Sequence, residues 1–192
     1  NFELGFIEVQ GYCIIENHCT ILKKPPDIGI LPLLAAMEES GSLFRIYQLA
    51  QKKKSFYIIA GNPIVSCLYA YSIRKAVGKS GTITGLICNS CFNGNYGKIL
   101  TRIFDKILYA DSIDSVDLER LIPKQHENAF DLTINCAEGT QTEVLNLILT
   151  KEHGTIFLSN IARHYSTAAL LSESFRKDVT VLCGVGYIKD FQ

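Results

Sequence analysis

The turn between residues 60 and 66 has the pattern most typical of ligand binding. It reads Ala60-Gly61-Asn62-Pro63-Ile64-Val65-Ser66, directly after an apolar segment and before one with helical spacing. A glycine-rich turn at such a place lets the main chain approach a dinucleotide pyrophosphate, whose charge the following helix N-terminus binds. Here only Gly61 is present, Pro63 removes one amide donor, and Ile64 and Val65 add bulk. The turn therefore predicts a fold more strongly than it predicts a nucleotide.

The residues after the next apolar segment allow a second check on nucleotide binding. Dinucleotide-binding folds place an Asp or Glu at the end of the second strand, where its carboxylate hydrogen-bonds a ribose hydroxyl. Cys88-Asn89-Ser90-Cys91 stands at that place and contains no acid. Asn89 and Ser90 still offer polar groups to a ribose. These residues therefore permit a nucleotide without requiring one.

Cys88 and Cys91 also have the spacing of a redox pair or of half a zinc site. A structural zinc ion takes four ligands, and nothing in the sequence fixes Cys13, His18 or Cys19 beside this pair. The remaining interpretation is a pair of ordinary thiols, which we prefer. We therefore expect no metal.

A regular series of elements is predicted to position these candidates. Apolar, strand-like segments alternate with segments of helical spacing. Strands separated by helices of about ten residues imply βαβ crossovers, and hence a parallel sheet covered by helices on both faces. We predict an α/β domain with a doubly wound, six-stranded, Rossmann-like parallel sheet. Its predicted strands are Phe56–Ala60, Thr82–Cys88, Lys106–Tyr109, Leu132–Cys136, Thr155–Leu158 and Val179–Cys183, and its predicted helices Val65–Val77, Tyr96–Phe104, Ser115–Leu121, Thr142–Leu149 and Thr167–Leu171.

This architecture also predicts where a ligand would bind. In an open parallel sheet, ligands bind beyond the carboxyl ends of the strands, at the point where the strand order reverses. That point is the turn after the first predicted strand, which contains Gly61.

Residues 1–26 do not follow the same alternation. Phe6–Val9 and Tyr12–Ile15 look like short strands joined at Gln10-Gly11, which predicts a small antiparallel β element. Pro25-Pro26 separates this element from a helical stretch over Ile28–Ala50 that is interrupted near Gly41. We therefore expect two units, residues 1–26 and residues 27–192.

Composition excludes several classes of partner. The 192 residues carry 19 Lys+Arg and 19 Asp+Glu, whereas nucleic-acid binders concentrate an excess of positive charge. No apolar stretch reaches the roughly 18 residues that span a bilayer, and the first residues do not resemble a signal peptide. The seven cysteines lie largely in apolar or helical segments, which is typical of reduced thiols. We expect a cytoplasmic protein that binds neither nucleic acid nor membrane.

The second half of the chain resembles a known family. Asp131–Cys136, Gly154–Ser159 and Ser166–Leu170 are similar to the coenzyme domain of medium-chain dehydrogenases. Lys177–Thr180 and Gly184–Lys189 bring the likeness closer to one branch, the L-erythro-3,5-diaminohexanoate dehydrogenases of lysine fermentation. The likeness covers most of residues 5–192 in order, including a leading segment that precedes the coenzyme domain.

The resemblance implies oxidative deamination of a diamino acid with NAD or NADP. Residues 1–26 would then be a remnant of the preceding catalytic domain, which carries most catalytic groups in this family. No catalytic residue is therefore assigned, and little turnover is expected of the domain alone. The family also implies a homodimer through the sixth strand, Val179–Cys183. Its coenzyme contacts map onto Gly61, Asn62, Pro63, Ile64 and Val65 for the pyrophosphate, Asn89 and Ser90 for the ribose, and Ala137, Glu138, Ser159 and Asn160 for the nicotinamide.

Two other interpretations stay open at this point. The eroded glycine turn and the missing acid are also typical of a degenerate Rossmann domain that has lost its coenzyme and serves as a scaffold or oligomerisation module. The third interpretation is a Rossmann domain that binds another nucleotide, or an acidic metabolite, at the same helix N-terminus. Well-kept strands favour none of the three, since packing alone preserves them.

Overall fold

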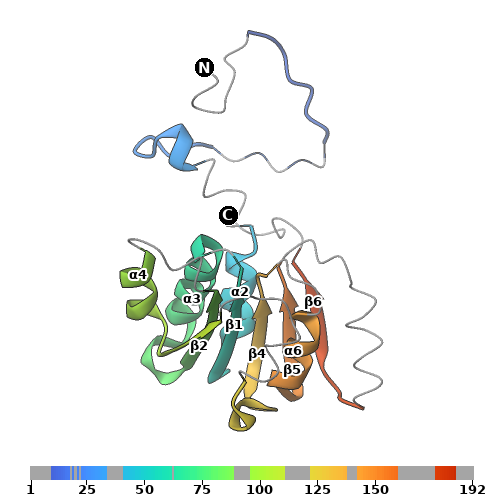
Figure 1. Ribbon diagram of the computed structural model, residues 1–192. Coiled ribbons are helices and arrows are strands. Elements are labelled where there is room, and N and C mark those ends of the chain that lie inside the picture. The colour runs from blue at the N-terminus through green and yellow to red at the C-terminus, as the bar shows by residue number, and fades with distance from the viewer. Residues whose placement is uncertain are drawn as a thin grey trace.

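A single parallel sheet organises the protein (Figure 1). The computed structural model describes residues 10–17, 19, 21, 23–33, 41–61, 63–88, 96–110, 122–137, 142–159 and 176–184. Six strands lie in the order β3-β2-β1-β4-β5-β6, and all neighbouring strands run parallel. This confirms the predicted doubly wound parallel sheet. The strands are β1 (Ser55–Ala60), β2 (Thr82–Cys88), β3 (Lys106–Ala110), β4 (Phe130–Asn135), β5 (Thr150–Leu158) and β6 (Thr180–Cys183).

Helices cover both faces of this sheet. On one face lie α2, α3 and α4, whose buried residues share a core with β1, β2 and β4; on the other, α6 packs through Leu145 and Leu149. The helices are α2 (Leu43–Ala50), α3 (Pro63–Val77), α4 (Tyr96–Ile103) and α6 (Thr142–Leu149), with short 3₁₀ turns η2 (Gly78–Ser80) and η4 (Lys124–His126). The helices predicted over Ser115–Leu121 and Thr167–Leu171 lie outside the described residues.

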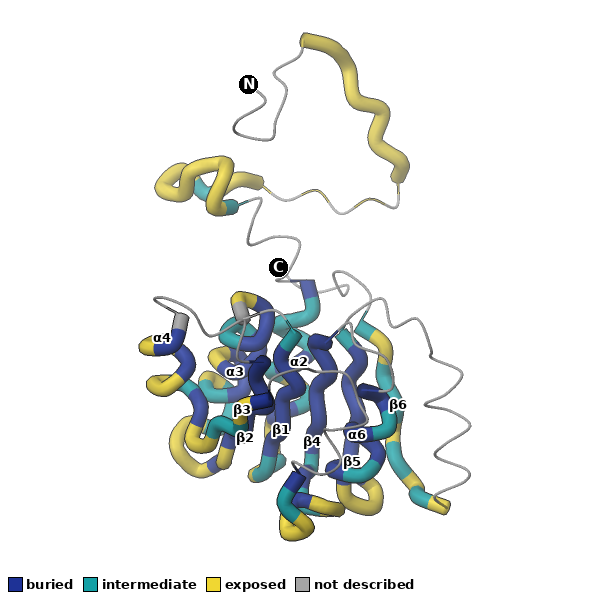
Figure 2. The backbone as a smooth tube through the Cα atoms, viewed as in Figure 1, coloured by how far each residue is buried: buried dark blue, intermediate teal, exposed yellow. Residues whose placement is uncertain are grey.

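The alternation along β1 explains why its sequence is continuously apolar. Phe56 and Ile58 belong to the core shared with α2, α3 and α4, whereas Tyr57 and Ile59 belong to the core shared with α6. A strand covered on both faces needs apolar side chains at every position. Figure 2 shows the result, with the central strands buried and the edge strand β6 largely intermediate or exposed.

An aspartate joins the central strands at their amino ends. Oδ2 of Asp131, on β4, accepts hydrogen bonds from Lys54 N, Ser55 N and Ser55 Oγ at the start of β1, each 2.9 Å long. Its other oxygen pairs with the ammonium of Lys151. Burial opposes ionisation of this carboxyl, but the hydrogen bonds outweigh burial and hold the pKa of Asp131 well below its usual range. The contact is called the Asp131 latch below.

The predicted N-terminal β element is not shown by the structure. Phe6–Val9 lies outside the described residues, and Tyr12–Ile15 forms no strand. The side chains of Tyr12 and Ile14 have exposed fractions of 105% and 96%, so nothing described packs against them. A strand needs a ladder partner for its main-chain groups, and the described part of residues 10–33 provides none.

The helical stretch predicted over Ile28–Ala50 is found in part. Residues 30–33 are helical and α2 begins at Leu43, while residues 34–40 lie outside the described part. Among the helices described, none is long and apolar enough to cross a membrane.

Candidate functional site

The strand order reverses between β1 and β4, and the carboxyl ends of both strands meet there. From this point the order runs outward to β2 and β3 on one side and to β5 and β6 on the other. In register, Ile59 pairs with Asn135, and Asn135 pairs with Leu158. The turns that follow β1, β4 and β5 therefore emerge side by side. We call this place the carboxyl edge.

The carboxyl edge brings together those predicted site residues that the structure describes. Gly61 follows β1, and α3 begins at Pro63, so that Ile64 and Val65 lie in its first turn. Ala137 follows β4, and Ser159 follows β5. The other predicted residues, Asn62, Asn89, Ser90, Glu138 and Asn160, lie outside the described part of the chain.

Gly61 is required by the packing of two turns against each other. A Cβ added at Gly61 would stand 2.6 Å from Ala137 Cα and 2.6 Å from the main-chain oxygen of Cys136. Real Cβ atoms do not approach main-chain atoms so closely, so only glycine fits. The sequence predicted a glycine that admits a pyrophosphate. The structure gives this glycine a second reason, since the turn after β4 fills the space beside it.

The N-terminus of α3 gives the edge a positive electrostatic character. This helix is 15 residues long, has no acidic residue in its first turn, and carries Arg74 and Lys75 in its last turn. The aligned peptide dipoles of such a helix place roughly half a positive charge at its N-terminus. Ile64 has an exposed fraction of 47%, whereas Val65 is buried at 4%. An anion reaching this helix would therefore meet main-chain amides and the side chain of Ile64.

Asn135, the last residue of β4, joins several parts of the edge. Its side chain is buried at 3%; Oδ1 accepts a hydrogen bond of 3.0 Å from Ala137 N, and Nδ2 donates one of 2.9 Å to Thr142 Oγ1 on α6. Its main-chain oxygen accepts a hydrogen bond of 2.9 Å from Ser159 N. One buried residue therefore contacts the turn after β4, the start of α6 and the turn after β5.

A pair of hydroxyl groups connects α3 to the turn after β5. Tyr69 OH and Ser159 Oγ are 2.5 Å apart, and Tyr69 is buried at 3%. The ring of Tyr69 also stands edge-on to Phe157 of β5, with 6.2 Å between ring centroids. Ser159 is half-buried. Its hydroxyl group therefore remains accessible to solvent at the carboxyl edge.

The described edge is therefore suited to binding rather than to acid–base chemistry. Gly61, Ile64, Val65, Ala137 and Ser159 include no carboxyl, imidazole or amine. Within the described ranges, no group of three or more His, Cys, Asp or Glu could hold a metal ion.

The predicted cysteine pair is described only in part. Cys88 is a buried cysteine at the end of β2, with an exposed fraction of 8%, while Cys91 lies outside the described residues. The structure therefore does not test the spacing as a redox pair.

Sequence reasoning missed Asn135, Thr142 and Tyr69. Tyr69 fits the apolar face of its helix, so nothing in the pattern distinguishes it from an ordinary core residue. Asn135 leaves a signal, because an amide at the end of a buried strand must find hydrogen-bond partners.

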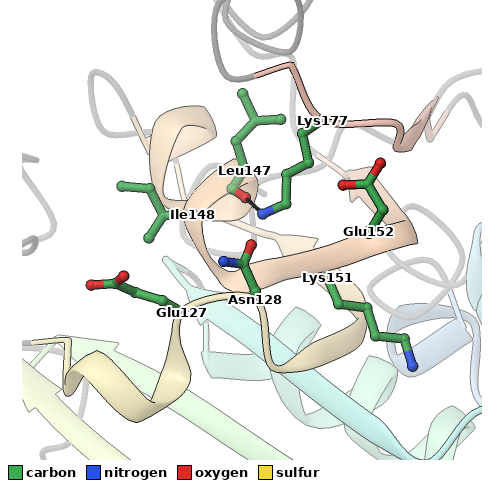
Figure 3. A pocket seen from close by; sticks show the side chains of 7 residues that line it. All are labelled: Glu127, Asn128, Leu147, Ile148, Lys151, Glu152 and Lys177. Carbon is green, nitrogen blue, oxygen red and sulfur yellow. Dashed lines mark hydrogen bonds between the residues drawn. The ribbon is translucent and has the colours of Figure 1, made fainter.

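A separate pocket of about 800 Å³ lies at the opposite, amino end of the sheet (Figure 3). Its polar groups already serve the fold. Lys177 donates to the main-chain oxygen of Leu147 in the last turn of α6, and Lys151 pairs with Asp131. Asn128 N donates to Ile148 O over 2.9 Å, which caps the same helix end. This pocket contains none of the predicted site residues; it is lined by Glu127, Asn128, Leu147, Ile148, Lys151, Glu152 and Lys177.

Known proteins that are similar to this chain in sequence or in fold include dehydrogenases. No protein-family model matches the chain. The chain is 27% identical over 189 residues to an L-erythro-3,5-diaminohexanoate dehydrogenase from Acetoanaerobium sticklandii, covering 97% of the chain and 54% of that relative. It is 28% identical over 191 residues to the enzyme of the same name from Fusobacterium nucleatum, covering 98% and 54%. This chain is similar to diaminohexanoate dehydrogenases along almost its whole length. It spans about half the length of these relatives.

Solved structures show the same fold. The alcohol dehydrogenase from Thermus sp. ATN1 superimposes with a TM-score of 0.56 at 17% identity, over 86% of this chain and 46% of that one. At this identity the match concerns the fold alone. It confirms the Rossmann-like architecture expected from the resemblance to medium-chain dehydrogenases.

Proposed function

We propose that this chain is the coenzyme-binding part of an NAD- or NADP-dependent oxidoreductase that acts as the diaminohexanoate dehydrogenases do. The observation that carries the proposal is the position of the α3 N-terminus. It lies directly after the central strand β1, where the strand order reverses. Open α/β sheets bind nucleotides at that point. The similarity to two diaminohexanoate dehydrogenases supports the same ligand class.

The residues at the edge fit a coenzyme through their main chain. In this proposal the first turn of α3, from Pro63 to Val65, faces the pyrophosphate, as helix N-termini do in other nucleotide sites. Ala137 and Ser159 then contact the nicotinamide side, and Asn89 and Ser90 the ribose. When bound, a nicotinamide coenzyme accepts or donates a hydride. The protein's part is to hold and orient it.

A second function is favoured by a specific observation. The close approach of Gly61 to Ala137 explains the glycine by packing, and Ile64 presents an exposed apolar side chain where a pyrophosphate would lie. Both features suit a Rossmann domain that has lost its coenzyme and serves as a scaffold. Another nucleotide or an acidic metabolite at the same helix end is a third candidate.

Coenzyme titration separates these functions. The 192-residue chain is titrated by calorimetry with NAD⁺, NADH, NADP⁺ and NADPH. Saturable binding of one pair supports the coenzyme proposal and assigns NAD or NADP. Bound ligand at one hundred times its Kd should also stabilise the fold by about 2.7 kcal/mol, which thermal unfolding detects. No binding at millimolar concentration of any of the four supports the scaffold function.

Two matched variants of α3 locate the site. Ile64→Asp places a carboxylate in the first turn of α3. The helix dipole stabilises this negative charge, but the carboxylate would repel a bound pyrophosphate. We expect coenzyme binding to weaken about tenfold through charge repulsion. Tyr71→Asp introduces the same carboxylate at a residue of similar exposure, 52%, further along the helix. This variant should bind within about twofold of the parent chain, since charge effects fall with distance and are screened. Equal affinities for the two variants would move the site away from α3.

The remaining expectations concern the larger protein. The exposed apolar side chains of Tyr12, Ile14 and Ile21 support the proposal that the N-terminal residues belong to a neighbouring structural unit. Because the described edge has no acid–base group, we propose that this chain alone has little turnover and that a diamino acid is oxidised only in a longer protein.

A homodimer through β6 is proposed as well. Among the described residues β6 is the last strand of the sheet, and none of them forms a strand on its outer side. Free edges of this kind pair readily with another chain. Sedimentation tests the dimer, and Val181→Pro in β6 should leave a monomer. A parent chain that sediments as a monomer contradicts the dimer.

A further inference from the structure

A buried polar seam runs along β4, and it contacts the first residue of α6 at one end and the first residue of β5 at the other. At the carboxyl end, Asn135 Nδ2 donates to Thr142 Oγ1 over 2.9 Å. At the amino end, Thr133 Oγ1 and Thr150 Oγ1 are 2.7 Å apart. Thr142 is the first residue of α6, and Thr150 is the first residue of β5, directly after that helix; Thr150 Oγ1 also donates to the main-chain oxygen of Asn146 in α6 over 2.5 Å. All four side chains are nearly or fully buried.

Polar side chains are unusual in this position, because leucines of α6 pack beside them against apolar residues of the sheet. Leu145 and Leu149 of α6 pack against Tyr57 and Ile59 of β1 in the same layer. Apolar residues of similar size would bury the interface without any need for hydrogen-bond partners. The hydrogen bonds of the seam therefore call for an explanation beyond packing, and their partners at the carboxyl end indicate one.

The Asn135 side chain controls the position of the turn after β4. Its Oδ1 accepts the hydrogen bond of Ala137 N, two residues further along the chain. Ala137 is the residue whose Cα stands 2.6 Å from the position of a Gly61 Cβ. Cys136 N also donates to Ile59 O over 2.9 Å, which continues the ladder with β1 beyond the end of the strand. A displaced turn would therefore press on the turn that leads into α3.

The same residue also fixes the turn after β5. The main-chain oxygen of Asn135 accepts from Ser159 N over 2.9 Å. The Ser159 hydroxyl is held in turn by Tyr69 of α3 at 2.5 Å. The three turns of the carboxyl edge thus form one connected set of contacts with Asn135 at its centre.

We propose that Asn135 is a positioning residue for the ligand site at the carboxyl edge, acting through the turns at Ala137 and Ser159. This inference takes the identity of the ligand from the coenzyme proposal. The contacts that support it are independent of that proposal. Asn135 is buried behind the turns and is not assigned a contact with the ligand. It fixes groups that a ligand would otherwise have to order on binding, and ordering of this kind weakens affinity.

The test compares the two ends of the seam. Asn135→Leu removes both side-chain hydrogen bonds and keeps the branching of the side chain, although its two methyl groups are larger than the amide oxygen and nitrogen. Thr133→Val removes the hydroxyl contact two residues earlier on the same face. Both variants lose buried side-chain hydrogen bonds of β4, but only the first removes a hydrogen bond from the turn after β4. We expect Asn135→Leu to weaken coenzyme binding about tenfold, the equivalent of one lost buried hydrogen bond. Thr133→Val should bind coenzyme within about twofold of the parent chain, because it leaves the turn after β4 in place. If Asn135 had a purely structural role, the two variants would lose affinity by similar factors.

A conservative variant and a second measurement complete the test. Asn135→Asp keeps an acceptor for Ala137 N, and the Thr142 hydroxyl can turn to donate to it, so the Ala137 amide should exchange at nearly the parent rate in this variant. Its coenzyme affinity is not compared, because the new carboxylate would repel a pyrophosphate by itself. Hydrogen exchange followed by NMR should show the amide of Ala137 exchanging about tenfold faster in Asn135→Leu than in Thr133→Val, because this amide loses its side-chain acceptor. The amide of Ser159 should keep its rate, since its acceptor is the main-chain oxygen of residue 135. Should Asn135→Leu not fold, Thr142→Val is the milder replacement, with a partial loss expected.

The outcomes separate this inference from the coenzyme proposal. If the parent chain binds none of the four coenzymes, the coenzyme proposal fails and the exchange rates alone decide the role of Asn135. If the parent chain binds and Asn135→Leu binds equally well, the positioning role is refuted. Equal losses in Asn135→Leu and Thr133→Val refute it too, because the effect would then be general destabilisation.

Discussion

The Asp131 latch should dominate the acid sensitivity of this fold. Asp131→Ala removes an acceptor that three donors share and leaves Lys54 N and Ser55 N without their partner at the start of β1. The carboxylate side chain has an exposed fraction of only 15%, so solvent replaces these bonds poorly. Hydrogen bonds to charged groups contribute about 1.5–3 kcal/mol each, though losses at one site do not add. We expect a loss of about 2–4 kcal/mol for Asp131→Ala, and a smaller loss of about 1–2 kcal/mol for Asp131→Asn, which keeps one oxygen.

The pH dependence of this contribution has a definite sign. The pKa of Asp131 is lower in the folded protein than in the unfolded chain, so the folded state binds fewer protons. The stabilisation is therefore fully present above the unfolded pKa of about 3.9 and disappears as the pH falls from there toward the folded pKa. Urea unfolding at pH 7, 5, 4 and 3 measures it. The parent chain should lose stability over this range, and its advantage over Asp131→Asn should shrink. A difference that stays constant down to pH 3, or an Asp131→Ala loss below about 0.5 kcal/mol, would refute this reasoning.

Two further variants test the packing of the edge and a second aspartate, Asp105, which precedes β3 and accepts hydrogen bonds from Arg74 and from Ile83 N of β2. Gly61→Ala should cost about 1–3 kcal/mol by denaturant unfolding, because its Cβ would meet Ala137 Cα at 2.6 Å, whereas Gly11→Ala, with no atom within 4 Å, should be neutral. Asp105→Asn should cost no more than about 1 kcal/mol, less than the Asp131 variant, because the Asp105 carboxylate is 43% exposed. If Asp105→Asn lowered the free energy of unfolding as much as Asp131→Asn, the exposure of the carboxylate would not determine the size of the loss.

The spacing of apolar residues predicted the bounds of a strand or helix well where its apolar residues are the ones that are buried. The predicted strand Thr82–Cys88 and the predicted helix Thr142–Leu149 match the structure residue for residue. β4 begins two residues before its predicted start at Leu132, since Asp131 resembles a turn residue in sequence yet pairs with β1 in space. β5 begins at Thr150, earlier than its predicted start at Thr155. The prediction began too late because the polar residues before Gly154 resemble a loop in sequence.

The candidate site was predicted less completely, for a physical reason. The sequence placed Gly61 at the correct turn, since the order of strands and helices alone fixes that place. The contact that requires a glycine there depends on where Ala137 lies, and Ala137 is 76 residues away along the chain. The partners of Asn135 and Tyr69 depend likewise on packing between elements. Local patterns indicate which residues are buried but not which buried groups meet.

The contacts at the carboxyl edge also decide which measurement can distinguish the candidate functions. Gly61, Asn135 and Tyr69 hold the three turns through contacts within the protein itself. A scaffold needs these contacts for stability, and a coenzyme domain needs them to present its amides in a fixed arrangement. Variants at these residues therefore destabilise the fold under either function, and unfolding experiments alone cannot choose between them. Ligand affinity can, because only a binding site makes the position of these turns matter to a second molecule.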